Sequence, residues 1–368
     1  MTSNILHLTL SQPRLSIITI NYNNAEGLRK TLASVAAQTY ANIEHIIVDG
    51  ASTDGSVDVI KEYENQLNIT HSTIHLLWSS EPDNGIYNAM NKGIEIALGR
   101  RVVNSLNRSE LVEDKNKGRE MDINSFNRSE RSDDKNRGIQ RATGEYIQIL
   151  NSGDLLAAPD VTERMMAALN EASPKSSPKG KDLHDADNSS LLFGRAGVGF
   201  FPAILYGNML KSYDGKTIIS RDTCGGKMYT PESFLYFYKG TLNHDCAYIR
   251  RDLFEKYGLY NEQMKICSDW EWYVRAIVLG GEKPIYTNID VTIFDMNGVS
   301  ESHGKNAELI KKERREYLES ILPPAVLHDY DQFAFPLLQY QRLKKYHLWG
   351  VVHFMERVLF KLEKWGMR

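Results

Sequence analysis

Four of the aspartates stand beside apolar runs, where a carboxylate can take part in chemistry. Asp49, Asp83 and Asp154 follow such runs, and Asp269 precedes one. A carboxylate oxygen can bind a divalent cation, or it can accept a proton from a substrate hydroxyl. Aspartates also form turns and cap helices, so a purely structural role stays open for Asp49, Asp154 and Asp269. The elements around these residues therefore decide whether the four side chains can act together.

The first part of the chain alternates apolar, β-branched runs with segments of helical spacing. This alternation predicts a parallel α/β sheet with right-handed crossovers. In such a sheet ligands bind beyond the carboxyl ends of the strands. Polar residues follow each predicted strand, namely Asn21 to Asn23, Asp49 with Gly50, and Glu81 to Asp83. The predicted strands are 15–21, 44–49 and 74–78, and the predicted helices between them are 27–38 and 56–65.

A polar repeat follows the predicted helix at 86–97. Residues 104–110 recur with small changes at 124–130, twenty residues later. A repeat that is so short and so poor in apolar residues cannot build the core of a solenoid. We interpret it as an inserted, partly disordered segment, and a partner-binding role is the alternative.

The pattern of strands and helices resumes after the repeat. An apolar strand is predicted at 144–150, and it ends in the polar run Asn151 to Asp154. Ser, Pro, Lys and Asp dominate 173–190, which is typical of a flexible loop. The further predicted elements are helices at 161–172 and 268–279, a strand at 246–250, and a helical, increasingly basic stretch at the end of the chain.

The composition excludes several classes of protein. The 368 residues carry 44 basic and 47 acidic side chains, a net charge of −3, so a nucleic-acid binder is not expected. Cys224, Cys246 and Cys267 are far apart and form no CxxC pair, which favours a reducing compartment. The sequence has no run of about 18 apolar residues to span a bilayer, and we expect no signal peptide.

Five segments of the sequence form a set of motifs in a fixed order. They are LSIITINYNN at 15–24, IIVDGASTDGS at 46–56, SEPDNGIYNAMNKGIEIA at 80–97, ATGEYIQILNSGD at 142–154 and CSDWEWYVRA at 267–276. Together they resemble family 2 glycosyltransferases of the GT-A fold. Joining Ala97 to Ala142 restores the family's usual passage from helix to strand, so the repeat stands as an insertion. The combination of EPDNGIYNAMNKG with NSGD resembles the branch that builds colanic acid, capsule and other bacterial surface polysaccharides.

The resemblance implies an α/β protein of the GT-A fold. Its central sheet would be Rossmann-like, mostly parallel and flanked by helices, and a helical C-terminal extension would follow. We expect a catalytic domain over 1–300, with the repeat-containing insertion at 98–141 and a flexible loop at 173–200. The basic helical extension would cover 301–368.

The resemblance also implies an inverting transfer of a sugar from a nucleotide-diphosphate sugar, most simply a UDP-sugar. The acceptor would be a hydroxyl of a glycan or of a lipid-linked molecule. A divalent cation, Mn²⁺ or Mg²⁺, would neutralise the leaving diphosphate, and Asp154 matches the metal-binding aspartate of the family's DxD-like motif. Asn151 and Gly153 stand where many members have acids, so a single protein carboxylate would hold the metal.

Donor binding is implied for residues at the strand ends and in the following helix. Tyr22 would stack on the base, and Asp49 would accept the uracil N3–H, although Gly50 replaces the family's second acid. The alternatives are a core aromatic for Tyr22, a turn former for Asp49 and a locally satisfied helix residue for Asn91. The residues matched to donor binding are Tyr22, Asn23, Asp49, Asp83, Asn91 and Asn151.

Asp269 matches the catalytic aspartate of the family, which takes the proton of the acceptor hydroxyl. Apolar neighbours are expected to desolvate Asp269 and raise its pKa. Glu271 is the second choice as base, because it faces elsewhere on a helix. His244 is a candidate contact for acceptor or diphosphate, and His303 is a candidate metal ligand. A structural role is the alternative for His244.

The C-terminal stretch predicts peripheral contact with the inner face of the cytoplasmic membrane. Residues 342–368 contain seven basic and two acidic side chains, and their apolar residues recur at helical spacing. Such a helix can lie among lipid headgroups. Packing of the apolar stripe on the catalytic domain or on a second subunit is the alternative.

Two other functions compete with a cytoplasmic transferase. A nucleotide-sugar-binding protein without catalysis is suggested by the degenerate metal motif, but it would have no need for both Asp154 and Asp269. A Rossmann-type oxidoreductase would need GxGxxG after the first strand, where Asn21-Tyr-Asn-Asn24 stands instead.

Overall fold

The computed structural model describes residues 12–104, 139–140, 144–172, 202–224, 231–296 and 306–364. Most of the predicted insertion and the predicted flexible loop at 173–200 lie outside these residues. His303 also lies outside them.

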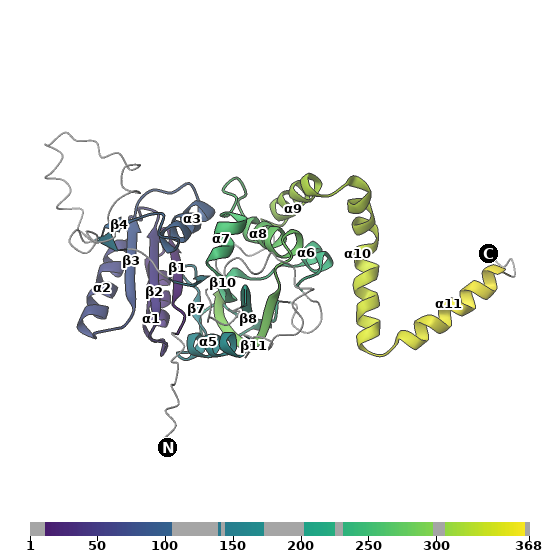
Figure 1. Ribbon diagram of the computed structural model, residues 1–368, viewed down its shortest axis with the longest axis horizontal. Helices are drawn as coiled ribbons and strands as arrows, with labels where there is room; N and C mark the ends of the chain where they lie inside the picture. The colour runs from purple at the N-terminus through teal and green to yellow at the C-terminus, as the bar shows by residue number, and fades with distance from the viewer. Residues whose placement is uncertain are drawn as a thin grey trace, which may run out of the picture.

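The first half of the main sheet is parallel, as the sequence predicts (Figure 1). Strand β1 pairs with β2 on one side and with β6 on the other, and β3 pairs with β2, all in parallel. The carboxyl ends of these strands therefore meet at one edge. The strands are β1 (Leu15–Asn21), β2 (Ile43–Asp49), β3 (His75–Ser80) and β6 (Tyr146–Ile149).

Helices cover both faces of this parallel half. Ile47 of β2 packs in a cluster with apolar residues of α1 and α2, whereas its neighbours Ile46 and Val48 belong to the larger core cluster that includes α3. A Cβ on Gly93 of α3 would lie 2.4 Å from Ile18 Cγ2, so only glycine lets this helix approach the strand so closely. The helices are α1 (Ala25–Ala36), α2 (Ser56–Ile69) and α3 (Ile86–Ala97).

The second half of the sheet is mixed. β10 runs antiparallel to both β6 and β8, β11 is parallel to β8, and the short strands β7 and β9 pair antiparallel at the margin. The α/β fold class is confirmed, and the pair of β8 and β11 is the parallel part of the second half. The strands are β7 (Leu155–Leu156), β8 (Ile204–Ser212), β9 (Ser220–Asp222), β10 (Ala247–Arg250) and β11 (Pro284–Asp295).

Short helical elements complete the body. α8 begins at Ser268 as predicted, but residues 274–279 continue it as a π-helical segment, η5 (Val274–Leu279). α5 has the predicted bounds. The elements are α5 (Val161–Ala172), α6 (Phe234–Lys239), the 3₁₀ turn η4 (His244–Cys246), α7 (Asp252–Tyr257) and α8 (Ser268–Tyr273).

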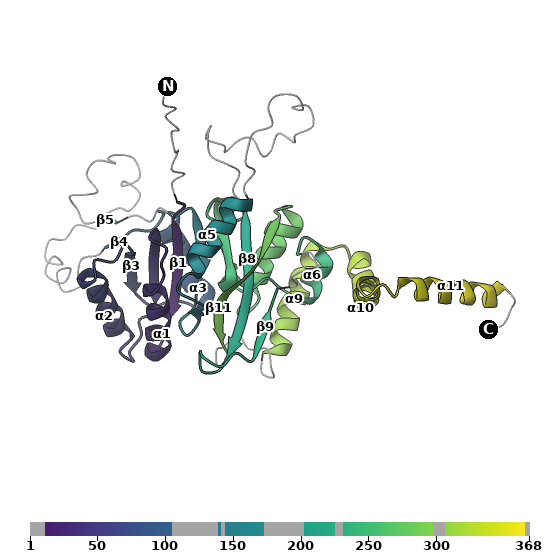
Figure 2. The same ribbon diagram turned by 90° about the horizontal axis from the view of Figure 1, so that it is seen from below.

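The predicted helical C-terminal region is present as three helices. The first, α9 (Ala307–Ile321), packs on the body through buried Leu318. The second, α10 (Pro324–Lys345), starts against α6, where the rings of Phe234 and Tyr330 have centroids 4.6 Å apart. The rest of α10 and α11 (Trp349–Lys364) project away from the body (Figures 1 and 2). Among the helices that the structure describes, none combines the length and the hydropathy that crossing a membrane requires.

The two described margins of the predicted insertion lie side by side. β4 (Val103–Asn104) and β5 (Ile139–Gln140) form an antiparallel pair, in which Val103 faces Gln140 and Asn104 faces Ile139. The described residues on the two sides of 105–138 are therefore neighbours in space.

Candidate active site

Asp49 ties together the carboxyl ends of the first three strands. Its Oδ1 accepts hydrogen bonds from Asn21 Nδ2 (2.8 Å) and Ser52 Oγ (2.6 Å). Its Oδ2 accepts from the Ser52 backbone N–H (3.0 Å) and from Ser80 Oγ (2.7 Å). The protein itself thus engages both oxygens of this buried carboxylate. These contacts favour the turn-forming alternative, and contact with a uracil ring stays a prediction.

The turns after β1 and β2 are bonded to each other. Asn23 has a φ of 47°, in the left-handed region that asparagine tolerates. Its backbone N–H donates to Ser52 Oγ (2.8 Å), and its Oδ1 accepts from the Thr53 N–H (2.8 Å). Tyr22, in the same turn, is 67% exposed. Tyr22 is therefore not a core aromatic, and its ring can meet a ligand above the strand ends.

Gly50 allows Tyr22 and Asp83 to approach each other. A Cβ at position 50 would lie 2.5 Å from Asp83 Oδ2 and 3.0 Å from Tyr22 Cδ2. The other oxygen of Asp83 accepts a hydrogen bond from the Gly85 N–H (2.9 Å). Gly50, which replaces the second acid of the family pattern, thus makes room for the carboxylate of Asp83.

Asn91 connects α3 to the loop that precedes α8. Its Nδ2 donates to the Tyr260 carbonyl (2.9 Å) and to Glu262 Oε1 (2.8 Å), while its Oδ1 accepts from the Tyr260 N–H (2.9 Å). The buried amide is therefore satisfied inside the protein. This is the structural alternative that the sequence left open for Asn91.

A second group of side chains gathers around Asp269 at the start of α8. His244 Nδ1 lies 3.3 Å from Asp269 Oδ2, and Tyr87 of α3 places its hydroxyl 3.1 Å from Asp269 Oδ1. On its far side, His244 Nε2 lies 3.2 Å from Nδ2 of Asn151 in the turn after β6. Two elements, α8 and η4, and this turn thus bring Asp269, His244 and Asn151 into one row.

The pKa of Asp269 is shifted in the direction opposite to the one expected from the sequence. Burial raises it, as expected, but the hydrogen bond and the positive charge of His244 outweigh burial, and the net pKa lies below the usual aspartate value. For His244 the signs are reversed. Burial lowers the pKa of the imidazole, but the hydrogen bond and the negative charge of Asp269 outweigh burial, and the net pKa is raised. The expectation of a raised Asp269 pKa was wrong because the sequence did not reveal this pairing. His244 Nδ1 and the Asp269 carboxylate thus face each other, and each shifts the pKa of the other toward its charged form.

Asp154 lies in the turn after β6 among other acids. Burial and the charge of Asp245 raise the pKa of Asp154 well above the usual aspartate value. Its Oδ1 accepts the Asp295 N–H at the end of β11 (2.9 Å), and Asp245 Oδ2 accepts from Thr292 Oγ1 (2.8 Å). Burial also raises the pKa of Asp245. Two buried carboxylates that repel each other favour the arrival of a cation.

The donor set fits a metal that enters together with a phosphate ligand. Within the described ranges, no group of three or more His, Cys, Asp or Glu side chains could hold a metal ion alone. Mg²⁺, however, is commonly bound by one or two carboxylates plus substrate phosphates, and Asp154 supplies one such carboxylate.

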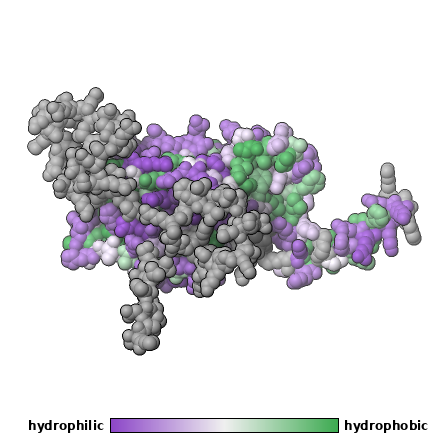
Figure 3. Space-filling view, viewed as in Figure 1, coloured by the Kyte–Doolittle hydropathy of each residue, from purple (hydrophilic) through white to green (hydrophobic). Residues whose placement is uncertain are grey.

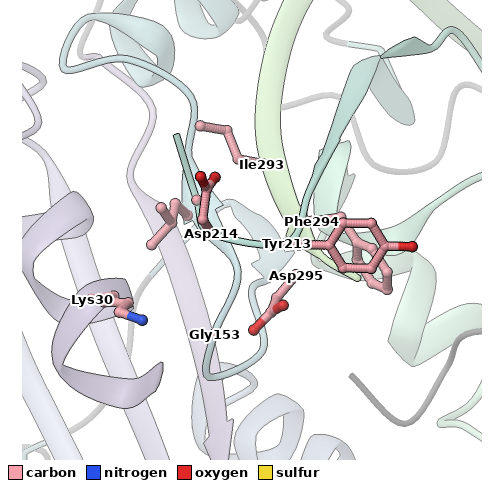
Figure 4. A pocket seen from close by; sticks show the side chains of 9 residues that line it. Lys30, Gly153, Tyr213, Asp214, Ile293, Phe294 and Asp295 are labelled. Carbon is pink, nitrogen blue, oxygen red and sulfur yellow. The ribbon is translucent and has the colours of Figure 1, made fainter. Parts of the chain in front are cut away.

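A small pocket opens beside the Asp154 turn (Figure 4). Gly153 has a φ of 109°, and a Cβ there would lie 3.3 Å from Asp295 Oδ2. Lys30 Nζ, on the opposite wall, pairs with Glu26 Oε1 (2.8 Å). The turn is therefore open to small groups from this side. The pocket is lined by Lys30, Gly153, Leu155, Tyr213, Asp214, Gly215, Ile293, Phe294 and Asp295.

Glu271 does not share the surroundings of Asp269. Its Oε1 accepts from Arg275 Nε (3.1 Å) and its Oε2 from Arg275 Nη2 (2.8 Å). A bidentate partner holds this carboxylate, which supports Asp269 as the better base. Tyr87, Asp245 and Asp295 were not predicted to have a role. Only Asp295 carried a local signal, because it is an acid that directly follows Ile293 and Phe294.

Comparisons with known proteins point to one family. The family model for Glycosyl transferase family 2 matches residues 16–105. An uncharacterized glycosyltransferase of Mycobacterium tuberculosis is 43% identical over 90 residues, which cover 24% of this chain and 31% of that protein. A PGL/p-HBAD biosynthesis glycosyltransferase of Mycobacterium bovis is 22% identical over 269 residues, 73% of this chain and 71% of that protein.

The fold is shared with a solved structure. The crystal structure of S. aureus TarS 1–349 in complex with UDP-GlcNAc superposes with a TM-score of 0.50 at 14% sequence identity, over 90% of this chain and 73% of that chain. At this identity the likeness concerns the fold.

Proposed function

We propose that this chain, whose residues 16–105 match the family model for Glycosyl transferase family 2, moves a sugar from a nucleotide-diphosphate sugar to a hydroxyl group of a glycan or lipid-linked acceptor. The donor is a UDP-sugar in the simplest case. One observation carries the proposal. An exposed aromatic ring, Tyr22, follows β1, and the buried Asp154 follows the neighbouring strand β6. In the turn after β6, Asn151 lies beside His244, which in turn lies beside Asp269.

The strand ends offer donor contacts of two kinds. Tyr22 can stack on a base, and Asp83 stands beside it where a carboxylate can accept an N–H or a ribose hydroxyl. Asn23 and Asp49 hold the two turns in place through Ser52. Asn151 lies in the turn after the neighbouring strand β6, beside His244.

Asp154 would hold Mn²⁺ or Mg²⁺ together with the diphosphate, and the bound cation would neutralise charge on the leaving group. Asp269 then acts on the acceptor. One of its oxygens takes the proton of the acceptor hydroxyl as that hydroxyl oxygen bonds to the anomeric carbon and the bond from this carbon to the diphosphate breaks. Attack opposite the leaving group inverts the configuration. His244 orients the Asp269 carboxylate and stabilises its charge.

His244 should set the position of the acid limb in the pH profile of kcat. The native pair keeps Asp269 ionised at lower pH than a free aspartate, because the imidazole outweighs burial. In His244→Gln burial remains and the positive charge is gone, so the pKa of Asp269 should rise. We expect the acid limb of the kcat profile to move to higher pH, which pH–rate curves of both proteins would measure. An unmoved acid limb would contradict the pairing.

We also propose the division of the chain that the sequence suggests. The catalytic domain covers 1–300, with an insertion at 98–141 and a loop at 173–200, and the helical extension covers 301–368. The pairing of β4 with β5 supports an insertion that leaves the surrounding fold in place. The family relationship supports a place in bacterial surface polysaccharide biosynthesis, in the cytoplasm.

The projecting arm of α10 and α11 supports peripheral contact with the inner face of the membrane. Val351, Met355 and Leu359 recur at helical spacing in α11 and are exposed, so the stripe does not pack on the body. Figure 3 shows hydrophobic and hydrophilic side chains next to each other along this arm. Lys361 and Lys364 lie in the last turn of the helix and can meet anionic headgroups.

Replacing the stripe with small polar residues should abolish membrane binding. The triple variant Val351→Ser, Met355→Ser, Leu359→Ser should no longer float with vesicles that contain anionic lipid, because apolar burial is lost. His353→Ser, an exposed change on the polar face of the same helix, should float like the unaltered protein. Equal flotation of the triple variant and the control would contradict the membrane proposal.

A further inference from the structure

One carboxylate of the C-terminal extension binds three consecutive backbone N–H groups of the catalytic body. Glu313 of α9 accepts hydrogen bonds from Lys265 (2.6 Å) through Oε1 and from Ile266 (3.1 Å) and Cys267 (3.0 Å) through Oε2. Its side chain is buried, with 8% of the residue exposed. The bonded segment ends two residues before Asp269.

These contacts account for a charge that would otherwise be costly to bury. Consecutive N–H groups form a concavity that suits an anion, and hydrogen bonds to a charged acceptor are stronger than neutral ones. Within the described part of the chain, the N-cap residue Cys267 offers α8 no side-chain cap. Glu313 of α9 therefore satisfies backbone N–H groups just before α8, where the N-cap residue does not.

The same backbone segment is held on its opposite side by α3. The Tyr87 hydroxyl lies 2.5 Å from the Ile266 carbonyl oxygen and 3.1 Å from Asp269 Oδ1. The N–H side of the segment therefore contacts Glu313, and its carbonyl side contacts the residue that also touches the base. A shift of this segment would displace Asp269 relative to Tyr87 and His244.

α9 also contacts the residue that follows Asp269. The guanidinium of Arg314 lies 5.0 Å from the ring centroid of Trp270, and Tyr317 meets the same ring edge-on at 5.7 Å. Trp270 is anchored by its Nε1, which donates to the Phe237 carbonyl (2.8 Å). α9 therefore holds α8 on both sides of Asp269.

We propose that Glu313 is a positioning residue for Asp269, and that α9 is part of the catalytic structure although it lies in the C-terminal extension. The proposal rests on the proposed function, which makes Asp269 the base. Glu313 acts through the backbone of residues 265–267 and does not touch substrate. Because a displacement of about 1 Å at a reacting group can cost roughly 10²-fold in rate, loss of this contact should appear mainly in kcat.

The variant Glu313→Gln tests the proposal in the full chain. The glutamine amide places an NH₂ group where an acceptor is required, so kcat should fall about 10²-fold while the donor KM stays within about twofold. Hydrogen exchange of the amides of residues 265–267 should accelerate. Glu316→Gln, an exposed change on the same helix, should alter neither quantity.

Leu318→Ala separates positioning from stability. This buried residue of α9 lies outside the contact with residues 265–267, so the variant should unfold at lower temperature and keep its kcat. A folded Glu313→Gln protein with unchanged kcat, or an equal fall in kcat for Leu318→Ala, would overturn the positioning role. A native protein that transfers no sugar would overturn the proposed function itself. Unchanged exchange at 265–267 in an active enzyme would overturn the role of Glu313 alone.

Discussion

Replacing Asp269 by asparagine should lower sugar transfer by roughly 10²- to 10⁴-fold, the usual contribution of a positioned general base. Asparagine has nearly the same shape and can still meet Tyr87 and His244, but it cannot take the proton of an acceptor hydroxyl. Donor affinity should change little, because the donor-side residues lie at the other end of the row. Steady-state kinetics with a nucleotide-sugar donor, and binding of the donor by calorimetry, measure the two quantities separately.

Glu271→Gln provides the matched control two residues away. The Glu271 carboxylate is held by Arg275, so its loss should affect stability and leave the chemical step within a few fold of normal. Near-normal turnover of Asp269→Asn, or a collapse of turnover in Glu271→Gln, would transfer the role of base to Glu271.

Asp154→Asn should abolish metal-dependent donor binding. The native protein should be stabilised against heat by a UDP-sugar with Mn²⁺, because a ligand that binds only the folded state raises its stability by mass action. The variant should show no such shift. In excess chelator it should unfold no earlier than the native protein, because a neutral amide relieves the repulsion that burial and Asp245 impose on the Asp154 carboxylate.

Asp160→Asn is the control for Asp154. It changes an exposed aspartate of the same segment that pairs only loosely with Arg164, at 3.8 Å, and the metal-dependent shift should persist. Full transfer activity in excess chelator would end the metal proposal. A native protein that is stabilised by donor and metal but transfers nothing would instead be a nucleotide-sugar-binding protein.

The sequence predicts the parallel half of the fold well because its signals are local. The strand at 15–21 is a continuous apolar run between Pro13 and a polar turn, and the helix predicted at 27–38 has apolar residues at helical spacing. β11 was missed because its twelve residues, PIYTNIDVTIFD, are mostly half-buried and carry no continuous apolar run. A strand whose burial depends on long-range neighbours leaves little trace in its own pattern.

The positions of the candidate site residues followed from sequence, but their partners did not. His244 and Asp269 are separated by 25 residues and Asn91 and Tyr260 by 169, so no spacing rule relates them. The direction of the Asp269 pKa depended on such a partner and was therefore predicted wrongly. In the sequence, Glu313 is one of four acidic residues among four basic ones in a helix, and nothing local distinguishes it. Its role follows from its contact with the backbone of residues 265–267.

The antiparallel pair of β4 and β5 places the two margins of the predicted insertion side by side. Paired strands lie only about 4.8 Å apart, so any segment spliced between them meets the same geometric demand whatever its length. Doubling the length of such a splice costs only about 0.6 kcal/mol in closure entropy. Duplication of a twenty-residue unit at this point therefore lowers the free energy of unfolding only slightly. For the same reason, a genetically encoded reporter or an affinity tag can be inserted between β4 and β5.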